Sequence, residues 1–306
     1  MRDGYGKALL ELCKNNQPVV VLDADVAKST RTVWIRDQYP DHFMDMGICE
    51  QDMVGTAAGI ALAGMMPFVS TYCVFLAGRA WDQIRTTVCY NNLNVKFGGA
   101  HAGISVGPDG ATHQSLEDVA LMRVLPNMTV IVPCDAEETR KATLAMARMD
   151  GPCFVRFGRE AVPVVTDSET PFEIGKARLC RSGKDVTVFA NGAMVYEALR
   201  AAEELAAEQI DVRVYDLHTI KPLDEEAILR AASETGCIVT AEEHQKNGGM
   251  GSAVAECLAE HHPVPLEMVA VNDSFGESGQ PEELMKKYGL SKEAITEKIR
   301  KVLCRK

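Results

Sequence analysis

Short runs of apolar residues alternate with amphipathic stretches along the first half of the chain. Apolar runs bounded by glycine, proline or polar residues indicate buried strands, whereas apolar positions that repeat every three or four residues indicate helices. Because the two kinds of segment alternate, they predict a parallel sheet with helices on both faces. The expected strands are PVVVLDADV (18–26), MPFVSTY (66–72), NVKFGG (94–99), TVIVP (129–133) and CFVRF (153–157), and the expected helices cover 1–16, 50–64, 75–92 and 136–149.

The same alternation begins again in the second half. The expected strands are DVTVFA (185–190), DVRVYD (211–216), CIVTAEE (237–243) and PLEMVAV (265–271), with a helix over 191–209 and two closing helices separated by Gly289. Between the halves, 162–177 contains two prolines and several acids without periodicity, which is typical of a linker. We therefore expect an α/β protein with two three-layer domains and mostly parallel sheets, divided into 1–165, a linker at 166–177, and 178–306.

An acidic residue, Glu50, lies at the N-terminus of the most apolar expected helix, within DMGICEQDMVGTAAGIALAG at 45–64. This helix has almost no polar face, so we expect it to be buried in a core or an interface. Two interpretations of Glu50 are open. It lies at the positive end of the helix dipole, as many carboxylates do, or it is held in apolar surroundings where it shares a proton with a bound ring nitrogen.

Composition narrows the class of protein. The chain has 306 residues, 46% hydrophobic and 25% charged, as in a soluble globular protein. Its formal net charge of -11 argues against nucleic acid or an anionic membrane as a partner. No segment resembles a signal peptide or a bilayer span. The ten cysteines form no CxxC pair and mostly lie in apolar runs, which is typical of reduced thiols, so we expect a cytoplasmic location.

The long glycine-rich segment at 100–118 is the polar stretch that says most about function. It brings His101, Asp109, His113 and Gln114 together among three glycines. Glycine allows close backbone approach to a ligand, and two imidazoles with a carboxylate can bind hydroxyls or anions and move protons near neutral pH. A surface loop with incidental histidines is the alternative, but long glycine-rich loops in compact domains tend to be functional. The spacing of the histidines does not fit the usual zinc sites.

Polar residues also follow two other expected strands. Asp25 and Ser29 come after the first strand, and Arg156 and Arg159 lie at the end of CFVRF. Ligands commonly bind at the carboxyl ends of strands in open α/β sheets, and arginine forks bind phosphate. The alternatives remain open: Asp25 and Ser29 cap and turn the chain, and either arginine forms a structural salt bridge.

Four motifs in order along the first half resemble the pyrimidine-binding module of the transketolase family. They are GICEQDMVGTAAGIALAG, PFVSTYCVFLAGRAWDQ, HAGISVGPDGATHQ and FVRFGRE. In the second half, LHTIKPLDEE, EEHQKNGGMGSAVAE and DSFGESGQPEELMKKYGL resemble the C-terminal domain of the same family. The resemblance covers nearly the whole chain, and it implies the fold of these two modules.

The resemblance implies thiamine diphosphate as the cofactor. Glu50 matches the family's glutamate that hydrogen-bonds the aminopyrimidine ring and shares a proton with it, so that the ring can activate the thiazolium carbon. Phe75 matches the aromatic residue that packs on the pyrimidine, with Tyr72 in the same pocket wall; both are otherwise plain core residues. Asp25 is placed at the cofactor's edge of the subunit interface. His113 is expected to act with Glu50 as a catalytic group.

The resemblance also implies a phosphorylated sugar as substrate. His101 and His113 match residues near the hydroxyls and the phosphate, and Asp109 matches a residue that selects the stereochemistry of a hydroxyl. Arg159 and Ser29 match the family residues that bind the sugar phosphate.

The chain departs from single-chain members of the family in lacking the GDG stretch and downstream asparagine that hold Mg²⁺ and the diphosphate. The resemblance therefore implies a C-terminal subunit of a split transketolase, transferring a two-carbon ketol unit. The Mg²⁺ and diphosphate site would belong to a separate N-terminal subunit with the GDG and asparagine motif. Self-association through the pyrimidine-binding domain would give a heterotetramer. Gly78 replaces an aromatic residue found in many members.

Three alternatives stay open. RAWDQ and the paired arginines favour a 1-deoxyxylulose-5-phosphate synthase-like enzyme. The beta subunit of a 2-oxoacid dehydrogenase has the same two domains, although HAGISVGPDGATHQ resembles a sugar-binding loop instead. A non-catalytic partner subunit would keep the fold without the chemistry. Fold-level kinship does not decide the substrate.

Overall fold

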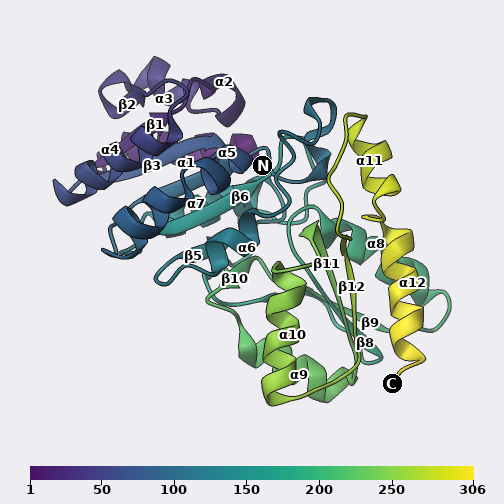
Figure 1. Cartoon of the computed structure of the whole chain (residues 1–306). Coiled ribbons are helices and arrows are strands. Elements are labelled where there is room, and N and C mark those ends of the chain that lie inside the picture. Colours follow the sequence, from purple (N-terminus) through teal and green to yellow (C-terminus); the bar gives the residue numbers. More distant parts are fainter.

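The computed structural model describes residues 1–306, and it contains two sheets with helices on both faces of each (Figure 1). The first sheet has seven strands in the order β10-β5-β6-β4-β3-β1-β2, and every neighbouring pair is parallel except β10 with β5. Its strands are β1 (Val19–Asp23), β2 (Phe43–Asp45), β3 (Met66–Tyr72), β4 (Lys96–Ala100), β5 (Thr129–Ile131), β6 (Cys153–Phe157) and β10 (Thr219–Lys221).

Alternate residues of these strands face two different cores. Phe68 packs in a core with α1 (Arg2–Lys14) and α7 (Ala136–Met146). Its neighbour Val69 packs in a core with α4 (Glu50–Leu62), α5 (Cys73–Arg79) and α6 (Asp118–Arg123). Because both faces are covered, the central strands carry apolar residues on both sides instead of alternating apolar with polar ones. The remaining short elements are α2 (Ala27–Thr30), α3 (Val33–Gln38), the 3₁₀ turns η1 (Pro40–His42) and η3 (Ile104–Asp109), and the π-helix η2 (Gln83–Cys89).

The second sheet has five strands in the order β12-β11-β8-β9-β7, parallel except for the edge strand β7. Helices α8 and α12 pack together and share one core with it, while α9 and α10 join the core that faces the first sheet. The elements are β7 (Arg178–Arg181), β8 (Val186–Ala190), α8 (Met194–Ala206), β9 (Val212–Asp216), α9 (Glu225–Thr235), β11 (Ile238–Gln245), α10 (Met250–His261), β12 (Leu266–Val271), α11 (Pro281–Lys287) and α12 (Lys292–Leu303).

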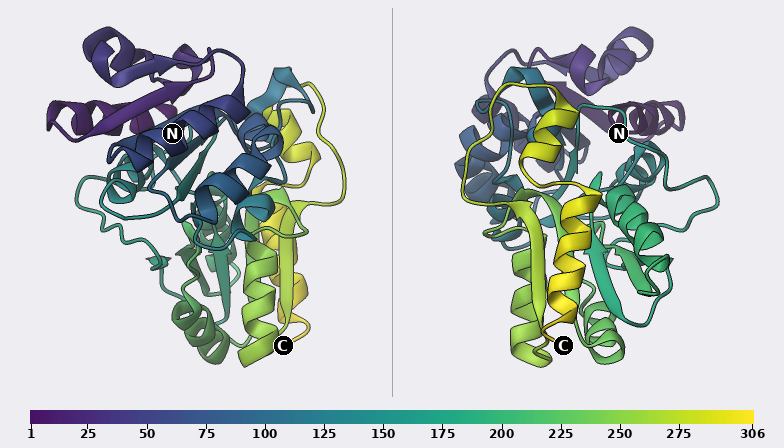
Figure 2. Two further views of the ribbon diagram at one scale, coloured as in Figure 1. Left: turned by 60° about the vertical axis from the view of Figure 1, so that its left-hand side comes forward. Right: turned by 90° about the vertical axis from the view of Figure 1, so that its right-hand side faces the viewer.

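Strand β10 crosses from the second half of the chain to the first sheet. Thr219 pairs with Ile131 and Lys221 with Val130, both antiparallel. Helix α11 crosses in the same direction and packs on η3, as both views in Figure 2 show. The two halves are therefore joined by backbone hydrogen bonds as well as by side-chain packing.

The structure confirms the predicted fold class and the nine expected strand regions. It corrects one helix: 75–92 is not a single α-helix but α5 followed by η2. Strands β2, β7 and β10 were not predicted, because runs of three or four residues leave no recognisable period. No cysteines are paired, and seven of the ten are buried. None of the helices is both long and apolar enough to traverse a lipid bilayer.

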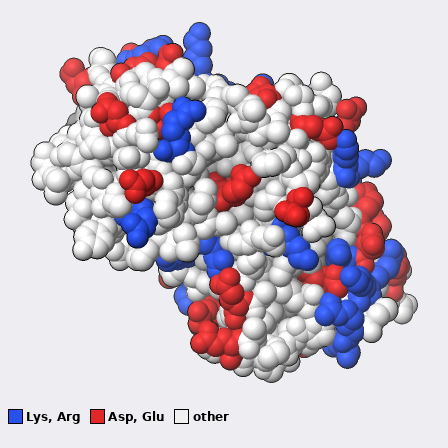
Figure 3. All heavy atoms as spheres, in the orientation of Figure 1, with Lys and Arg blue, Asp and Glu red and all other residues white.

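Charged side chains are unevenly distributed over the surface. In the view of Figure 3 they gather at the lower right, over α12 and its surroundings, whereas the left-hand flank, where α4 ends, is largely white. Leu62, the last residue of α4, is 75% accessible. One side of α4 is buried in the core through Met53, Val54, Ala57 and Ala58, and the other side faces outward, so its burial in an interface stays a prediction.

Candidate functional site

Glu50 is the first residue of α4, and its side chain is only 1% exposed. Arg79, at the end of α5, donates from Nη1 to Glu50 Oε2 over 2.9 Å. The sequence predicted a carboxylate in apolar surroundings, but the structure shows that it has a cationic partner. No local pattern indicated Arg79, because it lies 29 residues further along the chain.

Aromatic side chains continue from Arg79 in one connected group. The guanidinium carbon of Arg79 lies 4.7 Å from the ring centre of Phe75. Phe75 contacts His113 edge to face at 5.1 Å, and Tyr72 lies 6.2 Å from Phe75 and 6.0 Å from His113. The end of β3 and the first turn of α5 place these rings next to each other. Flat apolar surfaces of this kind favour contact with a planar ring.

His101 lies beneath this group, directly after β4. Its ring stacks on Tyr72 at 4.4 Å, and its backbone has a positive φ of 56°. The side chain is 3% exposed, and neither ring nitrogen has a hydrogen-bond partner. Burial, with smaller contributions from Arg2 and Arg159, lowers the pKa of His101 to about 3. His101 is therefore neutral near pH 7, and it can offer one donor and one acceptor to a ligand.

The low pKa of His101 predicts acid-sensitive stability. The unfolded chain takes up this proton near pH 6.5 and the folded chain only near pH 3, so acidification between these values favours unfolding. His101→Asn removes the titrating ring, and asparagine tolerates positive φ. We expect wild type to lose about 2 kcal/mol more stability than this variant between pH 7 and pH 5, as measured by urea unfolding. Equal losses would contradict the buried, neutral state of His101.

Asp109 and His113 lie in the glycine-rich loop, which we define as residues 101–115. Arg159 follows the end of β6. Arg159 Nη1 donates to Asp109 Oδ1 over 3.2 Å and to the carbonyl of Val106 over 3.0 Å. Both charged side chains are about one third exposed, at 31% and 34%. His113 is partly buried, with Nδ1 2.9 Å from Thr112 Oγ1. The loop thus presents an imidazole and an ion pair at an accessible surface.

Ser29 joins the same group from the segment that follows β1. Tyr72 donates its hydroxyl hydrogen to Ser29 Oγ over 3.0 Å. Buried Asp23 shapes this segment, because it accepts hydrogen bonds from the Val26 backbone and the Thr30 and Thr32 hydroxyls. Burial raises the pKa of Asp23 to about 6.

Asp25 lies in the same segment with a positive φ of 61°, is exposed, and forms no hydrogen bond or ion pair with the rest of the group. The structure therefore connects Glu50, Phe75, Tyr72, His113, His101 and Ser29 in one group through Arg79 and the ring contacts. Asp109 on the loop pairs with Arg159 after β6, and Asp25 stands apart.

Arg156 is part of the interior instead of the ligand surface. Its side chain is 5% exposed, and Nε donates to Asp118 Oδ2 over 2.7 Å. Nη2 donates to the carbonyls of Ser115 and Glu243. Of the two interpretations left open for Arg156, the structure favours the salt bridge.

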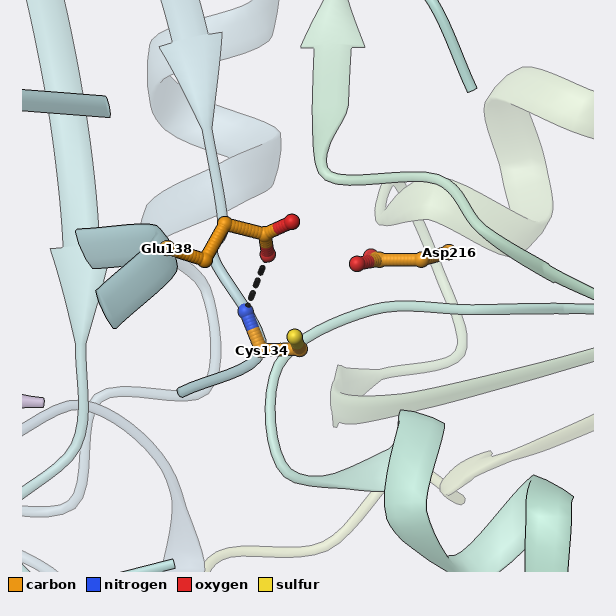
Figure 4. A group of neighbouring side chains, drawn as sticks. All are labelled: Cys134, Glu138 and Asp216. Atoms are coloured by element: carbon orange, nitrogen blue, oxygen red, sulfur yellow. Dashed lines mark hydrogen bonds between the residues drawn. The ribbon is translucent and has the colours of Figure 1, made fainter. Parts of the chain in front are cut away.

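A second buried cluster lies at the joint between α7 and β9. Cys134, Glu138 and Asp216 point toward one another, with potential ligand atoms within 4.8 Å, and the Cys134 backbone N–H donates to Glu138 (Figure 4). Arg178 Nη2 donates to Asp216 over 3.0 Å, so a cation already balances the charge. Burial raises the pKa of Cys134, and burial beside Asp216 raises that of Glu138. The cluster joins the two halves of the chain, because Cys134 and Glu138 come from the first half and Asp216 from the second.

A cavity of about 640 Å³ lies apart from the aromatic group. It is lined by residues 158–163, by the start of α8, and by residues of α11 and the start of α12. Neither Glu50 nor Phe75 lines it. Within their group Glu50 is buried, whereas Tyr72, Phe75 and His113 are partly exposed.

Two family models match the chain. The transketolase pyrimidine-binding domain matches residues 1–165, and the transketolase C-terminal domain matches residues 175–295. Together they cover both sheets.

Similar proteins match over the whole length. The chain is 43% identical to a putative transketolase C-terminal section of Methanocaldococcus jannaschii, covering 98% of this chain and 95% of that protein. It is also 43% identical to the 6-deoxy-6-sulfo-D-fructose transketolase subunit SqwH of a Clostridium species, covering 100% and 95%. A solved structure described as a split gene transketolase, inactive beta4 tetramer, superposes with a TM-score of 0.94 at 48% identity, covering 100% and 98%.

Proposed function

The chain belongs to the transketolase family, and on that premise we propose that it is the C-terminal subunit of a heteromeric transketolase. The enzyme transfers a two-carbon ketol unit between sugar phosphates and depends on thiamine diphosphate. The observation that carries the proposal is the buried carboxylate of Glu50, which Arg79 connects to the ring of Phe75 and, through it, to His113. A general acid–base group beside an aromatic surface is what a proton-sharing planar cofactor requires.

The residues present fit the pyrimidine end of that cofactor. Phe75 and Tyr72 offer ring faces, and Glu50 offers a carboxylate that water does not reach. Thiamine diphosphate, when bound, supplies a carbon nucleophile and an electron sink. Glu50 would hold and return a proton at the ring nitrogen. Arg79 now bonds Glu50 and covers Phe75, so it would have to yield part of this position to the ring.

The glycine-rich loop supplies the groups for the sugar. Neutral His101 can bond a hydroxyl or carbonyl oxygen through an N–H, and His113 stands at the accessible side of the rings, where it can move a proton. Arg159 bears a guanidinium that can bind a phosphate bidentately. Asp109, paired with Arg159, and Ser29, bonded to Tyr72, complete this set. Asp25 would contact the cofactor's edge only within an assembly.

The diphosphate and Mg²⁺ require residues that this chain lacks. Neither GDG nor its downstream asparagine occurs here with the family's spacing. Two relatives of nearly equal length are described as a C-terminal section and as a subunit, which supports a separate partner chain. That partner would bring the GDG motif, hold Mg²⁺, and cover the partly exposed rings of Phe75 and His113.

The test is reconstitution. We expect this chain alone to lack ketol transfer, and to gain it on mixing with the co-purifying chain that contains GDG, thiamine diphosphate and Mg²⁺. A set of phosphorylated ketose donors and aldose acceptors serves as substrate. Formation of lipoyl-linked acyl groups instead of ketol products, or absence of any GDG chain among the partners, would contradict the proposal.

Self-association through α4 is a second part of the proposal. The outward side of this helix carries Gly55, Gly59 and Leu62, and a Cβ built on either glycine meets nothing within 4 Å. Small residues beside an exposed leucine allow close approach of a second copy.

We expect Leu62→Asp to prevent this self-association, because a carboxylate would be buried in the interface without a partner. Light scattering coupled to size-exclusion chromatography measures the mass. Val164→Asp is the matched control, since Val164 is similarly exposed at 78% but lies after β6, in the segment that leads to the second half. Unchanged assembly of Leu62→Asp would place the interface elsewhere.

A further inference from the structure

The second half of the chain touches the glycine-rich loop at its root. The two ends of the loop are tied together, because Ala102 pairs with Ser115 and the Gly103 N–H donates to the Ser115 carbonyl over 2.8 Å. His113 lies between these ends, two residues before Ser115. Any group that fixes the root therefore also fixes where His113 stands relative to Phe75.

Glu243, in β11, makes a direct contact with this root. Its carboxylate Oε1 accepts a hydrogen bond from the Ser105 backbone N–H over 2.6 Å, and its side chain is 5% exposed. At Gly103, where φ is 89°, a Cβ would stand 2.3 Å from the carboxylate carbon. The carboxylate and the loop backbone thus touch without room for a side chain between them. This contact explains why glycine is required at 103.

Arg156 fixes the backbone of Glu243 against the other end of the loop. Its Nη2 donates to the Glu243 carbonyl over 2.7 Å and to the Ser115 carbonyl over 3.3 Å, while Nε is held by Asp118. One buried guanidinium therefore connects β11 to the residue where the loop ends.

A second set of contacts joins the loop to the segment before α11. Gln114 Nε2 donates to the Glu277 carbonyl over 2.9 Å and to the Ile104 carbonyl over 3.1 Å. Helix α11 packs on η3, within the loop, as Figure 2 shows. Glu277 contributes only its main-chain carbonyl to this contact, so a substitution of its side chain would leave the hydrogen bond in place. Glu243, by contrast, bonds the loop root through its side chain, so a substitution removes the bond while the backbone stays as it is.

We propose that Glu243 is a positioning residue for ketol transfer: from the second domain, it holds the glycine-rich loop in the shape that presents His113 and Asp109 to the sugar. This inference rests on the proposed function. It gives the second domain a direct part in shaping the substrate site, although no residue of β11 belongs to the aromatic group.

The neighbouring residue provides a matched control. Glu242 is also buried, and its carboxylate also accepts two backbone hydrogen bonds, from Met250 and Gly251 at the start of α10. Glu242→Ala and Glu243→Ala therefore remove similar groups from the same strand. Only the second leaves a loop N–H without its acceptor. Glu243→Gln keeps an acceptor oxygen in place and serves as the conservative variant.

Hydrogen exchange on the full chain tests the contact without any need for activity. We expect Glu243→Ala to speed exchange of the amides at 103–115 about tenfold, as expected for loss of one buried hydrogen bond. Glu242→Ala should act on 250–261 instead, and Glu243→Gln should stay near wild type. Unchanged loop exchange in Glu243→Ala would overturn the proposal.

Kinetics of the reconstituted complex test the positioning role. We expect Glu243→Ala to lower kcat/KM about 10- to 100-fold, mainly through a higher KM for the donor, with recovery in Glu243→Gln and no change in Glu242→Ala. A loosened loop with wild-type kinetics, or equal kinetic losses in both alanine variants, would overturn it. If the wild-type complex transfers no ketol unit, the proposed function fails, and with it the assignment of Glu243 to that reaction.

Discussion

Glu50→Gln is expected to reduce ketol transfer by the reconstituted complex about 10²- to 10⁴-fold, the usual contribution of a general acid–base group. Glutamine keeps the size and the hydrogen-bonding capacity of the side chain but cannot exchange a proton with a ring nitrogen. Its amide also gives Arg79 a weaker partner than the carboxylate does, at the 2.9 Å contact. The measurement is kcat under saturating cofactor, together with a binding titration of thiamine diphosphate.

Asp52→Asn is the control for this experiment. Asp52 lies in the same first turn of α4 but is exposed. It experiences the same helix dipole, so the pair of variants separates a role in chemistry from a contribution to the helix end. If Glu50→Gln turns over near the wild-type rate, Glu50 acts only by its interaction with the positive end of the helix dipole, and the proposed proton exchange is contradicted.

Arg156→Met is expected to lower the free energy of unfolding by about 3–5 kcal/mol, because it leaves a buried carboxylate without a counter-charge. Asp118 is fully buried; its Oδ2 accepts the hydrogen bond from Arg156, and its Oδ1 has no hydrogen-bond partner. The carbonyls of Ser115 and Glu243 would lose their donor as well. Urea unfolding of the full chain gives the difference.

Arg159→Met supplies the comparison on the same side of the sheet. Arg159 and Asp109 are each about one third exposed, at 31% and 34%, and ion pairs of that kind contribute about 0–1 kcal/mol. Adding Asp118→Asn to Arg156→Met should restore part of the lost stability, since the buried charge is then removed. Equal effects of the two arginine variants would contradict the assignment of Arg156 to the interior.

The sequence predicted the parts of the site that depend on local pattern. Glu50 was identifiable because an acidic residue at the mouth of an apolar helix is unusual, and His101 and His113 because a glycine-rich loop contains them. The partners of these residues were not identifiable. Arg79 is 29 residues from Glu50, and Glu243 is 138 residues from Ser105. Such pairs depend on the order of the strands in the sheets, which hydrophobic periodicity does not encode.

The same reason explains the errors in the fold. Long apolar runs such as β3 and β6 were predicted because both faces of a parallel strand are buried. Strand β10 has three residues, and its pairing with β5 reaches back across some 90 positions of the chain. The buried group of Cys134, Glu138 and Asp216 was missed for the same reason, since its members come from both halves.

Strand β10 restricts which segments of this chain can be replaced by those of a relative in a chimera, because it belongs to the second half in sequence but to the first sheet in the fold. A chimera cut at 166–177 would take its first sheet from one parent and the strand that closes that sheet's edge, Thr219–Lys221, from the other. A mismatched edge strand leaves unpaired backbone groups exposed, and these promote aggregation. Recombination should therefore succeed more often when the two halves are inherited together, or when residues 217–221 follow the first half.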